Sequence, residues 1–327
     1  MIRTALGSLC ALLLLTSPAN EYRDAHAQNR NVRELIAELN ASDPATRARS
    51  ACEIRELGDV AAEAIQPLAA MLGDAAPVEA LVCNRSWWRG NPNDLTSPGE
   101  QAAAALVAIG SKAFDPVLSA LRGTTWAARR NAAWALGAFD DPRAVSALID
   151  ALKDREAAVR EQVAWALGAL DDKRAVQSLI AALKDTDPRV RRQAAWALGA
   201  IDDSSATGAL TAALADDDER TREQAAWALG AIDDNGAVPA LIRSLTDPGE
   251  RVRKQSAWAL GAIDDSRAVD ALIKALADQS SGVRQQAAWA LGAIGDARAL
   301  PGLLPSLKDS DAGVRKQAAW AIGTIGR

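Results

Sequence analysis

Histidine is almost absent from this sequence: the only copy among its 327 residues is His26, close to the N-terminus. Imidazole is the commonest side-chain base at neutral pH and a frequent ligand of metal ions. Cys52 and Cys83 therefore lack the histidine partner that usually activates a thiol nucleophile. A glycine-rich phosphate loop is also missing. These absences predict a protein that is not an enzyme and that has no metal site and no cofactor.

Phenylalanine and tyrosine are also scarce, and the chain has no excess of positive charge. The chain has two Phe and one Tyr against ten Trp, so the tryptophans do more than add bulk to a core. Its 37 basic residues are outnumbered by 42 acidic ones, for a net charge of −5. Such a balance gives no general attraction to nucleic acids or to anionic membrane surfaces. We therefore expect no nucleic-acid partner.

Apolar runs are short. The longest, Ala5–Leu15, has eleven residues and is interrupted by small residues, whereas a membrane span needs about 20. Its length and position are typical of the apolar part of a signal peptide. Small-residue cleavage sites follow, one ending at residue 27 and another at Ala19. We predict a signal peptide over residues 1–27, with cleavage alternatively after 19. The mature chain, 28–327, is then exported to the periplasm or the extracellular space and has no membrane span.

The sequence is rich in one repeated segment. From about residue 112 onward a tryptophan recurs every 31 residues, and a glycine follows it three residues later. The tryptophans of this series are Trp134, Trp165, Trp196, Trp227, Trp258, Trp289 and Trp320. Glycine inside a helix costs about 1 kcal/mol relative to alanine, so its regular presence beside tryptophan needs a physical reason.

Each repeat reads as two helices. In one copy, Ser266–Ala277 carries apolar residues at helical spacing after the N-cap candidate Asp265, and Val283–Ile294 does so after a polar turn. A helix pair of this size cannot bury its apolar face alone, so the pairs must stack. The pattern continues upstream in degraded form, with an insertion at about 75–97. We predict an all-α fold: a right-handed α-solenoid of about nine stacked antiparallel helix pairs with a 31-residue period, forming one domain over 28–327.

The repeated words D-x-x-V-R-x-Q-A-A-W-A-L-G-A-I-D-D and R-A-V-x-A-L-I-x-A-L resemble the HEAT-like repeat family, in particular its short, phycobilin-lyase-type repeats. The resemblance implies the solenoid fold and covers nearly all of the mature chain. The family includes bilin lyases, the iron-dependent deoxyhypusine hydroxylase and many interaction scaffolds. The repeats here lack the histidines that hold iron in the hydroxylase. The resemblance also implies a ladder of ion pairs linking adjacent repeats, here Asp185, Arg191, Asp216, Arg222, Asp247 and Arg253.

The tryptophans point away from the core of their own repeat. At 100° per residue, Trp196 lies about 150° from the direction of the apolar residues Val190, Ala194 and Leu198 of the same helix. Gly199 lies on the same wall and leaves a recess that an indole of this repeat or the next can fill. The indoles could wedge between successive second helices, or they could form an aromatic strip along a concave groove. We expect each indole to do both.

The side chains beside the tryptophans predict the kind of partner. One turn before each Trp the charge alternates, with Arg192 and Lys254 among the basic residues and Glu161 among the acidic ones. A nucleic-acid groove needs a continuous basic strip, whereas a mixed aromatic surface suits a protein or an extended peptide. We predict a non-catalytic scaffold that binds such a partner. The alternatives are a bilin-lyase-like enzyme or chaperone, and a structural array that self-associates through its uncapped C-terminal repeat.

The insertion contains further candidates. Trp87 and Trp88 could extend the aromatic strip. Cys52 stands at the Trp position of the first repeat, where its side chain would face the groove or its rim. Export would permit a disulfide between Cys52 and Cys83; the alternative is two free thiols.

Overall fold

The structure is a computed structural model that describes residues 31–83 and 95–326. The predicted signal peptide, Trp87 and Trp88 lie outside the described residues. The chain divides into two compact units, Met1–Ala120 and Leu121–Arg327. A single domain over 28–327 stays a prediction.

The first unit contains short helices and one small ladder of two strands. Its α-helices are α2 (Val32–Glu38), α3 (Pro44–Leu57), α4 (Ile65–Met71), α5 (Pro98–Ile109) and α6 (Phe114–Ala120). The 3-10 segments are η1 (Gly58–Ala64), η2 (Ala80–Cys83) and η3 (Ser111–Ala113). β1 (Val78–Glu79) pairs antiparallel with β2 (Leu95–Thr96), with Val78 opposite Thr96. This ladder closes the base of the insertion and departs from the purely helical expectation.

The second unit repeats one helix pair. The first helices, seven residues each, are α8 (Val145–Ala151), α10 (Val176–Ala182), α12 (Thr207–Ala213), α14 (Val238–Ser244), α16 (Val269–Ala275) and α18 (Leu300–Ser306). Before each runs a 3-10 turn: η4 (Pro142–Ala144), η5 (Lys173–Ala175), η6 (Ser204–Ala206), η7 (Asn235–Ala237), η8 (Ser266–Ala268) and η9 (Ala297–Ala299). The longer second helices are α7 (Trp126–Ala138), α9 (Ala157–Ala169), α11 (Pro188–Ile201), α13 (Glu219–Ile232), α15 (Glu250–Ile263), α17 (Ser281–Ile294) and α19 (Ala312–Ile325).

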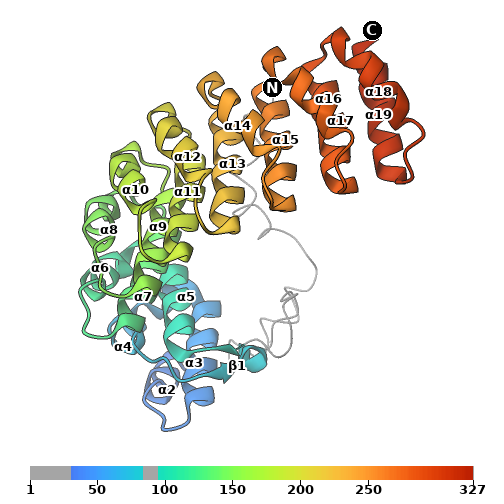
Figure 1. The fold of residues 1–327 in the computed structure, drawn as a ribbon. Coiled ribbons are helices and arrows are strands. Elements are labelled where there is room, and N and C mark those ends of the chain that lie inside the picture. The colour runs from blue at the N-terminus through green and yellow to red at the C-terminus, as the bar shows by residue number, and fades with distance from the viewer. Residues whose placement is uncertain (1–30, 84–94, 327) are drawn as a thin grey trace. The chain divides into compact units, whose positions relative to one another are not determined.

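Successive second helices pack directly on one another, from α7 to α19, and each first helix packs on the second helix of its own pair. Within this unit the second helices follow the inner side of the curve and the first helices its outer side (Figure 1). The α-solenoid of stacked helix pairs predicted from the 31-residue period is confirmed.

Aspartate pairs join one repeat to the next. Asp202 ends α11 in the left-handed region, with φ of 52°, and Asp203 then caps η6 by accepting a hydrogen bond from the Ser205 amide at 3.0 Å. Aspartate tolerates a left-handed backbone better than most side chains do. In one copy Gly295, with φ of 69°, takes the first position of the pair. The carboxylate of the second aspartate is the cap, as predicted for Asp265, which accepts from the Arg267 amide at 2.8 Å.

The first helices are shorter than predicted. The segment expected as one helix over Ser266–Ala277 consists of η8 and then α16, which ends at Ala275. The physical reason is the cap, since Asp265 accepts from the Arg267 amide two residues ahead and tightens the entry into a 3-10 turn. The second helix of this pair begins earlier than expected, at Ser281.

Alanine dominates the surfaces where second helices meet. In α11 Val190, Ala194 and Leu198 are fully buried, as the helical spacing predicted. Small side chains let the helix backbones approach closely, and the close approach of the next helix sets the geometry of the tryptophans. Among the described helices none is both long and apolar enough to cross a membrane.

Candidate functional site

The seven repeat tryptophans form what we call the indole row, one on each second helix from Trp134 to Trp320. Six of them are half-buried, and Trp320 in the last pair is 45% exposed. An indole that served packing alone would be buried, and one that served only a ligand would be largely exposed. The tryptophans of the indole row lie between these two extremes.

In six of the seven, from Trp165 to Trp320, the buried part of the indole sits against the glycine of the preceding repeat. A Cβ placed on Gly199 would lie 2.8 Å from Cζ3 of Trp227 and 2.7 Å from Cα of Ala228. The same contacts recur from Gly137 to Gly292, each with the Trp and Ala of the following helix. These distances leave no room for a methyl group. The glycine is therefore required because the next indole edge and the next helix backbone occupy the place of its side chain.

A ladder of arginine–aspartate pairs links the N-terminal ends of the second helices to the turns of the following repeats. Each arginine reaches the aspartate 25 residues ahead, in the turn of the next repeat. The shortest N–O distances of these pairs are 2.5 Å for Arg129–Asp154, 2.6 Å for Arg160–Asp185, 2.7 Å for Arg191–Asp216, 2.9 Å for Arg222–Asp247, 2.8 Å for Arg253–Asp278 and 2.7 Å for Arg284–Asp309.

Each ladder arginine also binds its own repeat. Arg253 donates through Nε and Nη2 to both carboxylate oxygens of Asp278, and through Nη1 to the carbonyl of Asp247 at 3.0 Å. It thereby joins two successive turns with one planar group, a geometry suited to guanidinium. Burial raises the pKa of Asp278, but the hydrogen bonds from Arg253 and from a backbone amide outweigh it and leave that pKa below its usual value. At Asp309, the hydrogen bond from Arg284 contributes most to lowering the pKa to about 2.

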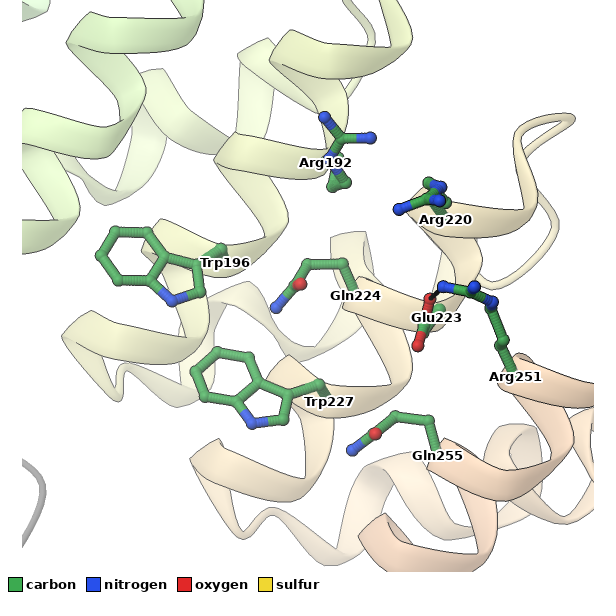
Figure 2. A pocket seen from close by; sticks show the side chains of 8 residues that line it. All are labelled: Arg192, Trp196, Arg220, Glu223, Gln224, Trp227, Arg251 and Gln255. Atoms are coloured by element: carbon green, nitrogen blue, oxygen red, sulfur yellow. Dashed lines mark ion pairs between the residues drawn. The ribbon is translucent and has the colours of Figure 1, made fainter. Parts of the chain in front are cut away.

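Beside the middle of the indole row lies a shallow pocket of about 440 Å³, which we call the central pocket. It is formed by α11, α13 and α15 and lies between Trp196 and Trp227 on one side and charged groups on the other (Figure 2). Two indoles, two amides and four charged side chains line it: Trp196, Trp227, Gln224, Gln255, Arg192, Arg220, Glu223 and Arg251.

The polar groups of the central pocket are largely unengaged. Within the described residues, neither Gln224 nor Gln255 has a hydrogen-bond partner, and Arg220 has no ion-pair partner. Glu223, the only carboxylate of the pocket, lies 3.9 Å from Arg251. Arg192 lies 4.0 Å from Glu161, just outside the pocket. At these distances the exposed pairs are weak.

Sequence reasoning identified only part of this pocket. Of the predicted partner-binding residues, Trp196, Trp227 and Arg192 line it, whereas Lys254 is exposed elsewhere on α15. Gln224, Gln255, Arg220 and Arg251 were missed. A signal for the arginines was present, because they stand seven residues before a repeat tryptophan, two helical turns away on the same face.

In the first unit Cys52 and Cys83 form a disulfide, with Cα atoms 5.7 Å apart. The bond ties the start of the insertion to α3. Cys52 is only 4% exposed. The reason for this burial is that η2 and β1, at the start of the insertion, pack on α3. Within the described residues no group of three or more His, Cys, Asp or Glu side chains could hold a metal ion.

Comparison with known proteins addresses the fold. YibA of E. coli is 18% identical with a TM-score of 0.58, covering 96% of this chain and 98% of that one. Kap95p, in a structure of its binding to RanGDP, is 15% identical with a TM-score of 0.67, covering 94% of this chain and 49% of that one. The CpcE–CpcF complex of phycocyanin lyase from Nostoc sp. PCC7120 is 28% identical with a TM-score of 0.45, covering 65% and 93%.

A search of curated proteins gives no match. The family model of HEAT repeats matches residues 114–186, 176–260 and 245–323, which together span more than half of the chain. The resemblance read from the repeated words is confirmed, and the chain belongs to the HEAT-repeat family.

Proposed function

We propose that this protein is a non-catalytic, exported scaffold that binds an extended segment of a protein partner along the indole row. The observation that carries the proposal is the half-buried state of the tryptophans. From Trp165 to Trp320, each indole uses one edge to fill the glycine recess of the preceding repeat and keeps another part of its surface exposed. Aromatic side chains held rigid in this way are typical anchors of protein interfaces.

The glutamines beside the indoles support an extended peptide as the ligand. Gln193, Gln224 and Gln255 each stand three residues before a repeat tryptophan and are half-buried. A glutamine amide both donates and accepts, so it can satisfy the N–H and C=O groups of an extended main chain. Kap95p, which has a similar fold, is seen in its structures bound to two proteins, RanGDP and Nup1.

The proposal is tested by selecting binders from a library of random peptides displayed on phage, with the purified protein as bait. Selected peptides are then titrated against a Trp196→Leu/Trp227→Leu variant. We expect its affinity to fall at least about tenfold, the effect of removing an interface anchor. Trp126→Leu is the matched control, because Trp126 is 42% exposed but stands outside the indole row. Peptides that bind both variants as well as the wild type would refute the proposal.

Self-association is a second candidate, favoured by the last helix pair. Three of the six large apolar side chains that are exposed among the described residues lie there: Leu304 at 56%, Leu307 at 39% and Trp320 at 45%. A second copy could cover them. A mass that rises with concentration in sedimentation equilibrium, and stays constant for a Leu304→Lys/Leu307→Lys variant, would support this role. A constant mass for the wild type would contradict it.

A further inference from the structure

The second helices of the repeats differ from one another in the charge they carry beside the indole row. The ladder arginine and the alanine before each tryptophan are the same in all seven copies. In contrast, the residue seven before the tryptophan is alanine in the first two copies, arginine in the next three and glycine in the last two. The three arginines are Arg189, Arg220 and Arg251. Because this residue changes while its neighbours on the helix stay the same, it gives the middle repeats a surface that differs from that of the end repeats.

These three arginines are not equivalent. Arg189 donates to Asp187, two residues earlier on the same chain, at 2.8 Å. Arg251 forms an ion pair with Glu223, with Nη1 of the arginine 3.9 Å from Oε2 of the glutamate. Arg220 is exposed and makes no ion pair within the described residues. It lines the central pocket together with Arg192 and Arg251.

The central pocket therefore has a local charge opposite to that of the molecule. Three guanidinium groups face it against one carboxylate, Glu223, on a chain whose net charge is −5. A guanidinium without a carboxylate partner is a strong donor pair for a ligand carboxylate, which it can bind through two parallel hydrogen bonds. The positive charge is interrupted along the row, since the position one turn before the tryptophan is Glu161 or Glu223 in two repeats and Gln285 in another. A long polyanion would meet Glu161 and Glu223 along the same row.

We infer that the central pocket selects a partner segment carrying an acidic side chain, whose carboxylate binds Arg220 with support from Arg192 and Arg251. This inference rests on the proposed function. Figure 2 shows the arginines on one side of the pocket and the indoles on the other, with the glutamine amides between them. The segment then places its acidic residue toward the guanidinium groups, an apolar neighbour against Trp196 or Trp227, and its main chain beside Gln224 and Gln255.

The test is a double-mutant cycle with peptides from the library selection. The selected sequences should be enriched in Asp or Glu at one position. A synthetic peptide of this kind and its Asp→Asn or Glu→Gln counterpart are titrated by fluorescence anisotropy against the wild type and Arg220→Gln. Each single change should weaken binding about tenfold, as for a hydrogen bond to a charged group. The two changes together should weaken it no further, because they remove the same contact.

Two controls make the outcome specific. Arg243→Gln removes an exposed arginine from α14, outside the central pocket, and should leave the affinity unchanged. A single-stranded oligonucleotide should bind weakly and equally to the wild type and to Arg220→Gln. Oligonucleotide binding that is lost in Arg220→Gln would overturn the inference in favour of a nucleic-acid site.

The failure of the inference differs from that of the proposed function. Selected peptides without acidic enrichment, bound equally by the wild type and Arg220→Gln but not by the Trp196→Leu/Trp227→Leu variant, would overturn only the acidic specificity. Peptides insensitive to both changes would overturn both.

Discussion

At the scale of single residues, each glycine of the repeat is needed because of a neighbouring tryptophan. The indole is wide enough to reach the preceding helix while part of its surface stays exposed, and glycine is the one residue that gives its edge room. Sequence reasoning located this pair and its wall of the helix, but left open which repeat supplies the indole. That choice depends on the rotation between neighbouring helices, which no single-helix periodicity contains. The structure shows that the following repeat supplies it.

A buried serine gives a prediction at the same scale. Ser256 on α15 is fully buried, and within the described residues its Oγ has no hydrogen-bond partner. The neighbouring repeats have Ala225 and Ala287 at this position. An unsatisfied buried hydroxyl costs about 1–3 kcal/mol, so Ser256→Ala should raise the free energy of unfolding by about 1 kcal/mol or more. Urea denaturation measures the change. A loss of stability would mean that the hydroxyl has a partner in solution.

At the scale of helices, capping and ion pairs fix the order of the repeats. The caps were predictable, because aspartate before a helix is a local signal, and the ladder was implied by the resemblance to the HEAT-like repeat family. The 3-10 entry of the first helices was not predicted, since a helical pattern of apolar residues does not distinguish a 3-10 turn from an α-helical one. The central pocket was also missed, because its eight side chains converge from three helices whose spacing only the structure provides.

The ladder predicts a dependence of stability on position. Arg253 is almost buried against Asp278, so Arg253→Gln should lower the free energy of unfolding by about 3 kcal/mol at neutral pH, the lower range for breaking a buried pair. Arg315→Gln is the matched control. Within the described part of the chain Arg315 makes no ion pair and donates only to carbonyl groups. Its loss should have a small effect, and equal effects of the two changes would contradict the ladder.

The ladder also predicts a dependence on pH. The folded-state pKa values of Asp185, Asp216 and Asp278 lie below their usual value, and that of Asp309 is about 2. A lowered pKa means that the carboxylate stabilises the fold above its unfolded pKa of about 4, and that this stability is lost as pH falls toward the folded value. Thermal unfolding of the wild type should therefore shift downward between about pH 4 and pH 2. The deficit of Arg253→Gln should shrink over the same range. A constant deficit would show that Asp278 is not coupled to Arg253.

At the scale of the whole molecule, different interactions stabilise the two units internally. The second unit repeats its contacts from pair to pair, so its stability is a sum of neighbouring interfaces. The first unit has a degraded repeat, and a disulfide supplements it at the insertion. Spacing predicted the repeat. The indole row was predicted to combine packing with exposure, and the structure places its tryptophans in that intermediate state.

The disulfide gives a prediction for the first unit. Cys52 and Cys83 are 31 residues apart in sequence. Closing a loop of this length should stabilise the fold by about 3–4 kcal/mol through the unfolded state. Cys52→Ala/Cys83→Ala should therefore unfold at lower urea than the oxidised wild type. Reductant should lower the wild-type midpoint and leave that of the variant unchanged. Two free thiols in the oxidised, purified protein would contradict the pairing.

The most direct test of the account compares one substitution at two equivalent glycines. In Gly230→Ala the new methyl group would lie 2.7 Å from Cα of Ala259 and 2.7 Å from Cζ3 of Trp258, whereas at Gly323 nothing lies within 4 Å. Overpacking typically costs about 1–3 kcal/mol, and alanine in place of a helical glycine gains up to about 1 kcal/mol. The midpoint of urea unfolding should therefore fall for Gly230→Ala and rise for Gly323→Ala. A rise for both variants would show that the glycines do not receive the indoles of the following repeats, and would contradict the account.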